Sequence, residues 1–150
     1  MNLQSLFENL INSGPKFSDP EVTRKIKALN IFQLGYIMLA PLLGLFYFYV
    51  GAISLFYVII VAGLLMIPSV IILRKTKGIL WMANYSIFVL WATLFIVSWN
   101  TGAMTSEGVM STSWLLNGGI LLLAVFLNGY AWGAFWALIV LVQAAVVSYL

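Results

Sequence analysis

Charged side chains are scarce in this chain, and most of them are confined to short segments. The seven basic residues form two groups, one before the first long apolar stretch and one in a polar gap near the middle: Lys16, Arg24, Lys25 and Lys27, then Arg74, Lys75 and Lys77. After Lys77 only Glu107 is charged. Charged residues make up 7% of the chain and hydrophobic residues 63%, whereas about a quarter of the residues of a soluble domain are charged. The composition therefore predicts an integral membrane protein.

The chain contains no cysteine and no histidine. Thiol redox chemistry, Cys/His metal sites, haem ligation and Ser-His or Cys-His catalysis each lack a central residue. We therefore expect no metal, no cofactor and no catalytic residue in this chain. The net charge of +3 resides in segments that flank apolar stretches, where basic residues act as orientation signals. This distribution argues against nucleic acid as a partner and favours the lipid bilayer.

Five apolar stretches predict an all-α bundle of about five transmembrane helices. A bilayer core of about 30 Å needs roughly 20 helical residues to cross it. Gly51-Ala52 and Asn128-Gly129 supply the turn signals between the first and last pairs of stretches. The last two stretches together are too long for a single crossing, which favours two. The expected spans are 30–50, 53–73, 79–99, 112–127 and 130–150.

The segment before these spans has a different pattern. Apolar residues form one helical stripe between polar residues, which predicts a short amphipathic helix in the membrane interface: Leu3, Leu6, Phe7, Leu10 and Ile11. A frayed tail, or a helix that packs on another domain, remains an alternative. Residues 1–17 are therefore assigned to this helix and its connector, and 18–150 to the transmembrane domain. The next helix is expected to start with Ser18 as N-cap and Glu21 completing a capping box.

The basic residues also predict the orientation of the bundle. An N-terminus in the cytoplasm places all seven basic residues on the cytoplasmic side, and the opposite orientation places them all outside. Glu107 then lies on the outer side. Five crossings leave Leu150 outside without a polar tail, so the sequence is expected to be cut from a longer protein.

No ionisable residue falls inside an expected span, which argues against an active pump. The spans instead contain neutral polar residues: Asn30, Gln33, Asn84, Ser86, Thr93, Ser98, Ser113, Asn117, Gln143 and Ser148. Hydrogen bonds between helices, worth roughly 0.6 to 2 kcal/mol each, would explain them. A second interpretation is a polar ligand pocket near the outer leaflet, formed by spans 79–99 and 112–127 and by the loop between them. The candidate ligand-binding residues are Ser98, Asn100, Glu107, Ser113 and Asn117.

Small residues recur at near-helical spacing in the last span: Gly133, Ala137, Ala144 and Ser148. Such a stripe allows two helix backbones to approach closely. We expect it to mediate packing within the bundle, with contacts between the two copies of a homodimer as the alternative use.

Several segments together resemble the N-terminal multi-pass membrane domain of bacterial histidine kinases and class III nucleotidyl cyclases. They are Ser18–Glu21, Arg24–Ile26, Leu29-Asn30, Trp99–Gly102 with the Ser/Thr-rich run to Trp114, Asn128-Gly129 and Trp132–Ala134. The resemblance implies a sensory or anchoring module of a signal-transduction protein in the bacterial cytoplasmic membrane. It also implies a further span and an effector domain outside this sequence. A homodimer is the expected assembly.

The expected function is therefore that of a membrane sensor or anchor, with a histidine kinase as the first expectation for the whole protein and no enzymatic activity in this chain. The stimulus would be a small molecule or a state of the membrane. A small oligomeric transport or channel subunit is the alternative, since neutral polar residues lie in the spans and small residues line the last one. A purely structural anchor or assembly factor also fits the sequence.

Overall fold

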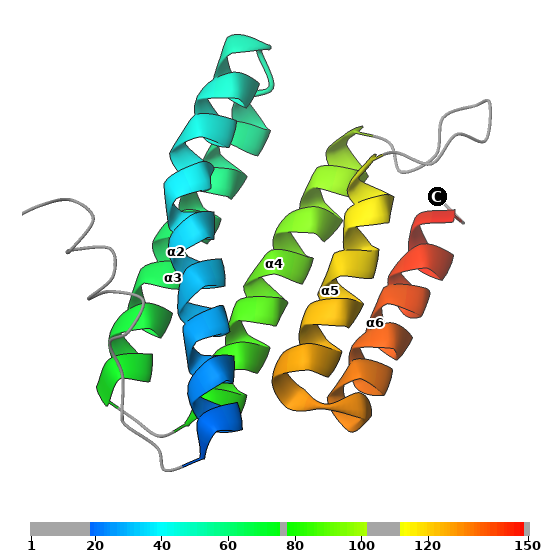
Figure 1. The fold of residues 1–150 in the computed structure, drawn as a ribbon. Coiled ribbons are helices and arrows are strands. Elements are labelled where there is room, and N and C mark those ends of the chain that lie inside the picture. The colour runs from blue at the N-terminus through cyan, green and yellow to red at the C-terminus, as the bar shows by residue number, and fades with distance from the viewer. Residues whose placement is uncertain (1–18, 76–77, 102–111, 149–150) are drawn as a thin grey trace, which may run out of the picture.

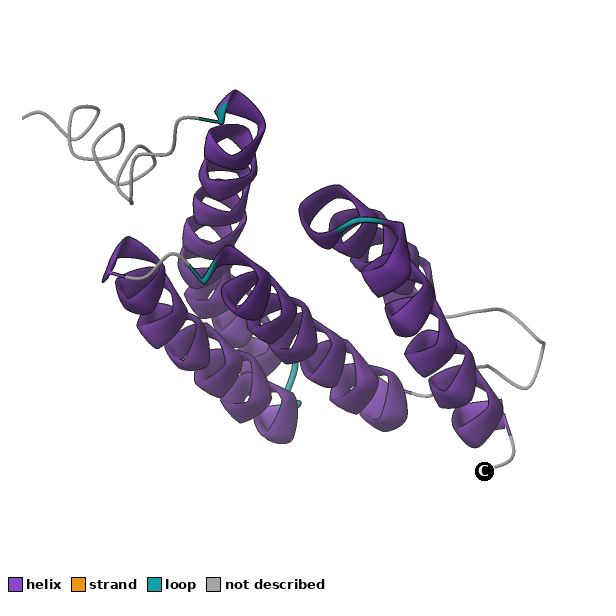
Figure 2. Ribbon diagram, turned by 90° about the horizontal axis from the view of Figure 1, so that it is seen from below, coloured by secondary structure: helices purple, strands orange, loops and turns teal. Residues whose placement is uncertain are grey.

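The computed structural model describes residues 19–75, 78–101 and 112–148, in which every regular element is an α-helix (Figure 2). The five described helices are α2 (Pro20–Tyr49), α3 (Ile53–Lys75), α4 (Ile79–Thr101), α5 (Thr112–Asn128) and α6 (Tyr130–Ser148). They cover the five apolar stretches of the sequence, so the expected all-helical fold class is confirmed. The predicted interfacial helix of residues 1–17 lies outside the described residues.

Three of these helices are long and apolar enough to cross a membrane. The qualifying segments are Pro20–Tyr49, Ile53–Leu73 and Ile79–Asn100, with 30, 21 and 22 residues. A crossing takes about 20 residues, so each has the necessary length. The apolar segments of α5 and α6 are shorter than these three.

The start of α2 differs from the sequence prediction by one residue. Asp19, not Ser18, is the N-cap, and its carboxylate accepts a hydrogen bond of 2.8 Å from the backbone N–H of Glu21. Pro20 occupies the first helical turn, where its missing N–H removes no helical hydrogen bond. The prediction that Ser18 caps the helix is therefore wrong, because the aspartate next to the proline performs that role.

Consecutive helices run in opposite directions, so the chain alternates between two ends of the bundle (Figure 1). We call the end with the α2–α3 turn the upper end, and the end with the α5–α6 turn the lower end. Both turns contain a glycine with positive φ, 85° at Gly51 and 86° at Gly129. Other residues rarely adopt this conformation, which explains how the single residue Gly129 reverses the chain between α5 and α6.

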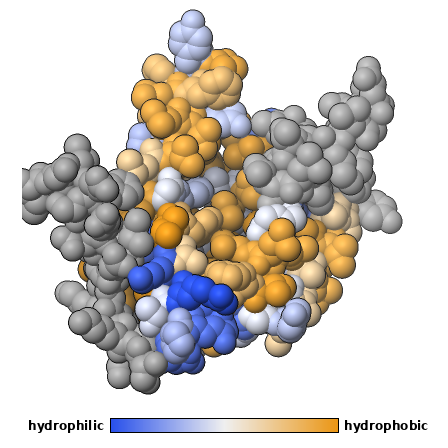
Figure 3. All heavy atoms as spheres, in the orientation of Figure 1, coloured by the Kyte–Doolittle hydropathy of each residue, from blue (hydrophilic) through white to orange (hydrophobic). Residues whose placement is uncertain are grey.

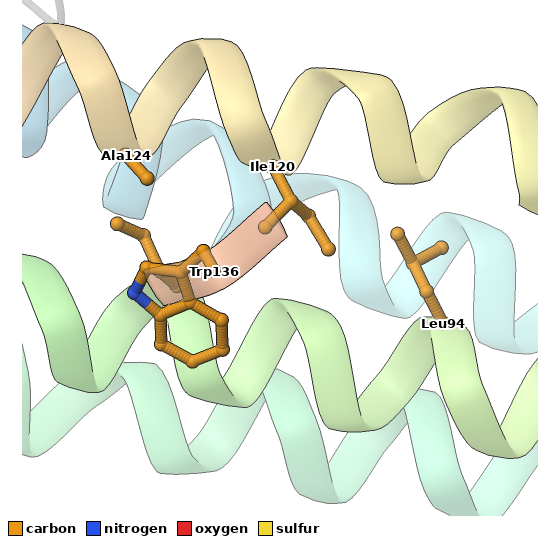
Figure 4. Packing of buried hydrophobic residues seen from close by; sticks show 5 residues of the cluster. Leu94, Ile120, Ala124 and Trp136 are labelled. Carbon is orange, nitrogen blue, oxygen red and sulfur yellow. The ribbon is translucent and has the colours of Figure 1, made fainter. Parts of the chain in front are cut away.

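Each helix packs against the next along the chain, and buried apolar side chains fill the contacts. One cluster joins α4, α5 and α6 through Ile87, Leu94, Ile120, Ala124 and Trp136 (Figure 4). A second joins α2, α3, α4 and α5 through Leu29, Leu73, Ala83 and Leu127. The second cluster links the two halves of the bundle near its lower end.

The outer surface of the bundle is largely apolar (Figure 3). Leu42 on α2 is 64% exposed and Leu122 on α5 is 75% exposed, in company with many other large aliphatic and aromatic residues. Soluble monomers rarely expose apolar patches of this extent. Hydrophilic side chains gather at the lower end (Figure 3), where Lys25 and Glu21 form an ion pair of 2.8 Å.

Candidate functional site

A buried polar cluster joins the three helices α2, α3 and α4. The side-chain nitrogen of Gln33 on α2 donates two hydrogen bonds of 2.7 Å, one to the hydroxyl of Ser69 on α3 and one to that of Ser86 on α4. The Ser86 hydroxyl in turn donates to the backbone carbonyl of Met82 at 2.8 Å. Of the Gln33 amide, only Oε1 has no hydrogen-bond partner among the described residues. We call Gln33, Ser69 and Ser86 the lower polar cluster.

Two further hydrogen bonds strengthen the same junction. The Tyr36 hydroxyl on α2 bonds to Thr93 on α4 at 3.2 Å, one helical turn above the Gln33 contacts. The Tyr85 hydroxyl on α4 donates to the backbone carbonyl of Leu65 on α3 at 2.9 Å. These two bonds tie α4 to both α2 and α3 beyond the lower polar cluster. We call α2, α3 and the face of α4 toward them the closed side.

The candidate ligand residues of the sequence are dispersed by the fold. Ser98 and Asn117 are buried, with exposed fractions of 0% and 2%. Asn100 lies on the exposed surface of α4, and its side-chain nitrogen donates to the backbone carbonyl of Ile96 at 2.8 Å. Glu107 is outside the described residues, and Ser113 lies in the first turn of α5 with its side chain outside them. Of the five candidates, the structure thus buries two.

A residue outside that candidate set, Gln143 on α6, lies at the level of Asn117. Ala124 and Trp136 belong to one buried cluster between α5 and α6. Asn117 precedes Ala124 by seven residues, and Gln143 follows Trp136 by seven. Seven residues are about two helical turns and return to the same face. Because the helices are antiparallel, both side chains lie about two turns above the cluster.

Ser98 on α4 belongs to the same upper region. It lies about one turn beyond Leu94, a member of the cluster that includes Ile120, and Asn117 lies about one turn above Ile120. We call Ser98, Asn117 and Gln143 the upper polar residues. They come from α4, α5 and α6, and each is at least 97% buried.

The upper polar residues differ from the lower cluster in their hydrogen bonding. Among the described residues, the Ser98 hydroxyl and both polar atoms of the Asn117 and Gln143 amides have no hydrogen-bond partner. A buried polar group without a partner costs about 1–3 kcal/mol. Buried groups of this kind are normally satisfied by bound water, a ligand or another chain. The upper region therefore has an unused capacity for hydrogen bonds.

A groove runs between α4 and α6, and of the upper polar residues Gln143 contributes to its wall. Its lower part is a cavity of about 520 Å³ whose wall includes Trp81, Tyr85, Trp132 and Phe135. Its upper part is a cavity of about 350 Å³ whose wall includes Trp91, Phe95, Leu138, Val142 and Gln143. Ile139 contributes to both walls, so the two cavities adjoin along the groove.

Aromatic side chains cross the groove where the two cavities meet. The Trp136 indole N–H on α6 donates to the Asn84 side-chain oxygen on α4 at 3.0 Å, and the rings of Trp91 and Trp136 lie 6.4 Å apart. The Trp91 indole N–H is buried and has no hydrogen-bond partner among the described residues. We call α5, α6 and the face of α4 toward them the open side.

Small residues of α6 lie on the open side at different depths. Gly133 packs so closely on Val125 of α5 that a Cβ atom at this position would overlap the valine side chain. Ala137 and Ala144 are half-buried, and the side chain of Ser148 lies outside the described residues. Gly133, at the lower end of α6, therefore allows the close approach of α6 to α5.

The sequence identified the buried polar residues more readily than their hydrogen-bond partners. Gln33, Ser86 and Gln143 stand out as polar residues in apolar stretches, whereas Ser69 gives no such signal because serine is common in membrane helices. The spacing i, i+3 between Gln33 and Tyr36 places both on one face of α2, and this is the only local sign that the lower junction exists.

The chemistry available to the described residues is limited to neutral hydrogen bonding and apolar contact. No group of three or more His, Cys, Asp or Glu side chains suited to a metal ion occurs in that part of the chain. Every polar side chain buried there is uncharged. Comparison with known proteins gives no match to a family model, to a curated protein or to a solved structure.

Proposed function

We propose that the chain is an integral membrane domain in which all five helices cross the bilayer, with the N-terminus in the cytoplasm. The length and composition of α2, α3 and α4 support this proposal, as does the exposed apolar surface around the bundle. Basic residues before α2 and between α3 and α4 support the orientation, because basic loops are retained on the cytoplasmic side. By its resemblance, the membrane is the bacterial cytoplasmic membrane.

Within that membrane, we propose that the domain is a sensory or anchoring module of a signal-transduction protein, with a histidine kinase as the first expectation. The observation that supports this best is the contrast inside the bundle. The closed side is cross-linked by hydrogen bonds, whereas the open side has a groove and unpartnered polar groups. A ligand that binds only one arrangement of the open side shifts the population toward it.

The main alternative is a transport or channel subunit. Transporters that move ions or protons usually place ionisable residues inside the membrane, and the buried polar residues of the described chain are all neutral. The unpartnered amides of Asn117 and Gln143 are the features that a polar pathway would use. A measurement of ion or solute flux across a membrane that contains the protein therefore tests the alternative.

Two measurements test the proposed function. In liposomes that contain the purified protein, we expect no more flux of protons, K⁺ or small neutral solutes than in empty liposomes, and a clear flux would contradict the sensory module. In the native host, a chromosomal Asn117→Leu replacement should change the same transcripts as deletion of the gene, at an unchanged protein level. An unaltered transcript profile in the deletion strain rules out a signalling role. An altered profile in the deletion strain alone indicates an anchor.

A further inference from the structure

The upper cavity of the α4–α6 groove combines an apolar wall with two hydrogen-bonding groups that have no partner. Trp91 on α4 and Gln143 on α6 both contribute to the wall of this cavity of about 350 Å³. The Trp91 indole N–H and both polar atoms of the Gln143 amide lack partners among the described residues. Ligand sites have volumes from about 300 Å³ and place a few polar groups in a mainly apolar wall; here the wall is apolar and the polar atoms of Trp91 and Gln143 are buried beneath it.

The polar atoms lie directly behind the accessible wall, which is itself apolar. Glutamine has an unbranched, flexible side chain, so rotation about its bonds can turn the amide toward a molecule in the cavity. A buried amide without a partner gains free energy from such a rotation if the molecule offers an acceptor. The rings of Trp91 and Phe95 are stacked 5.8 Å apart, and both contribute aromatic surface to the cavity wall.

The donors and the absence of charge define the ligand chemistry. Trp91 offers one N–H, and Gln143 offers an amide NH₂ as well as one carbonyl oxygen. These groups suit an oxygen acceptor such as a carbonyl. No charged side chain is among the residues that form the upper cavity, so a carboxylate there would be buried without a counter-charge, at a high cost. The remaining wall is aliphatic and aromatic and suits an apolar chain or ring.

We propose that the upper cavity binds a neutral, lipid-like molecule whose apolar body carries a hydrogen-bond-accepting carbonyl oxygen. Trp91 and Gln143 donate to that oxygen, and the apolar body extends along the groove past Ile139 toward the lower cavity. The inference rests on the proposed function, since it identifies the class of stimulus that such a sensory module would detect.

Binding of three matched probes to the purified protein in detergent micelles tests this inference. The probes are 2-dodecanone, which has a carbonyl, n-dodecane, which has no acceptor, and dodecanoate, which is charged. The apparent Kd is obtained from the rise of the thermal unfolding midpoint with probe concentration, because a ligand that binds the folded state stabilises it. We expect 2-dodecanone to bind about a hundredfold more tightly than n-dodecane, the effect of two hydrogen bonds of about tenfold each. Dodecanoate should bind more weakly than the ketone.

Substitutions then locate the site. Gln143→Met replaces the amide with an apolar chain of similar length, and Trp91→Phe keeps an aromatic ring but removes the indole N–H. Each should weaken 2-dodecanone binding about tenfold. Neither should alter n-dodecane binding by more than about twofold. Gln33→Met is the matched control, because Gln33 is equally buried but belongs to the lower polar cluster. It should lower the unfolding midpoint without changing the Kd.

Three outcomes would overturn the inference. They are equal affinity for the ketone and the alkane, an unchanged Kd in both donor variants, or an equal loss of affinity in Gln33→Met. Because Trp91→Phe removes no hydrogen bond seen in the structure, it remains informative if Gln143→Met does not fold. If these binding tests fail, the proposed function is still compatible with an anchor. Flux in liposomes, or an unaltered transcript profile in the deletion strain, would instead contradict the proposed function itself.

Discussion

The two sides of the bundle use the same kind of residue in opposite ways. Gln33 on the closed side and Gln143 on the open side are both buried, although α2 is a less apolar helix than α6. Gln33 bonds to Ser69 and Ser86, whereas the amide of Gln143 has no partner among the described residues. The comparison shows that a polar residue in an apolar helix indicates burial but does not reveal whether it serves packing or ligand binding.

The arrangement of neighbouring helices explains the difference. On the closed side, α2, α3 and α4 converge around one level, so that a single amide reaches two hydroxyl groups. On the open side, α5 packs against both α4 and α6, while α4 and α6 meet chiefly through Trp136 with Asn84 and Trp91. The groove remains where that direct packing is missing. We infer that stability is concentrated on the closed side and adaptability on the open side.

The largest expected effect concerns the contact between α2 and α3. A Cβ atom on Gly63 would lie 2.7 Å from the Cβ of Ala40, whereas nothing lies within 4 Å of a Cβ on Gly118 of the open side. Gly63→Leu should therefore lower the free energy of unfolding by about 1–3 kcal/mol through overpacking. Gly118→Leu, the matched control, should leave it unchanged or raise it. Titration with a denaturing detergent measures both, and equal effects would contradict the contrast between the two sides.

The second effect compares the two glutamines directly. Gln33→Met removes two hydrogen bonds and should cost about 1–2 kcal/mol, given the modest strength of such bonds between membrane helices. Gln143→Met removes an unpartnered amide, so it should be neutral or stabilising. The same detergent titration provides the measurement. A larger loss for Gln143→Met than for Gln33→Met would show that the open side holds hidden hydrogen bonds.

The third effect is the difference in stability between substitutions of two tryptophans in the groove. Trp136→Phe removes the hydrogen bond to Asn84 and should cost about 1 kcal/mol. Trp91→Phe removes an indole N–H without a partner and should cost less. Fluorescence-detected unfolding of the two variants measures the difference, and the reverse order would argue that Trp91, rather than Trp136, links α4 to α6.

The smallest effect is the coupling within the lower polar cluster. Ser86→Ala and Gln33→Met should be less destabilising together than the sum of the single changes, by about 0.6 kcal/mol for the bond that they share. Ser98→Ala combined with Gln33→Met is the control and should be additive, because the Ser98 hydroxyl has no partner among the described residues. Additivity in both pairs would mean that the bond contributes nothing measurable.

The elements of the fold were predictable from the sequence, whereas the pairing of the helices was not. The apolar runs and the turn residues Gly51 and Gly129 define where helices end, since few other residues adopt positive φ. Which face of each helix is buried was not predictable, because a helix in lipid is apolar on both its buried and its outer sides. For that reason the sequence did not separate the buried Asn117 from the exposed Asn100.

The site was predictable only in part for the same reason. Ser98 and Asn117 were selected because they lie near one end of neighbouring spans, and their spacing from the buried cluster that contains Leu94 and Ile120 supports their common level. Gln143 was visible as an isolated polar residue, but its level depends on the antiparallel register of α5 and α6, which follows from the turn at Gly129. The groove could not be predicted, since it depends on the spacing of α4 and α6, which are not consecutive.

The account as a whole depends on the bundle lying in a membrane with its basic end in the cytoplasm. The chain contains no cysteine, so single cysteines introduced along α2 report the environment of each level without interference. Lys27 is an exposed basic residue near the lower end, Leu42 is exposed on the apolar surface, and Tyr49, at 92% exposure, ends α2 at the upper end.

The most direct test is therefore labelling of Lys27→Cys, Leu42→Cys and Tyr49→Cys with a membrane-impermeant maleimide, before and after permeabilisation of bacterial cells that produce the protein. The account predicts that Tyr49→Cys reacts in intact cells, that Lys27→Cys reacts only after permeabilisation, and that Leu42→Cys reacts in neither state because lipid covers it. Labelling of Lys27→Cys in intact cells would indicate the opposite orientation of the bundle. Efficient labelling of Leu42→Cys after permeabilisation would contradict the membrane crossing itself.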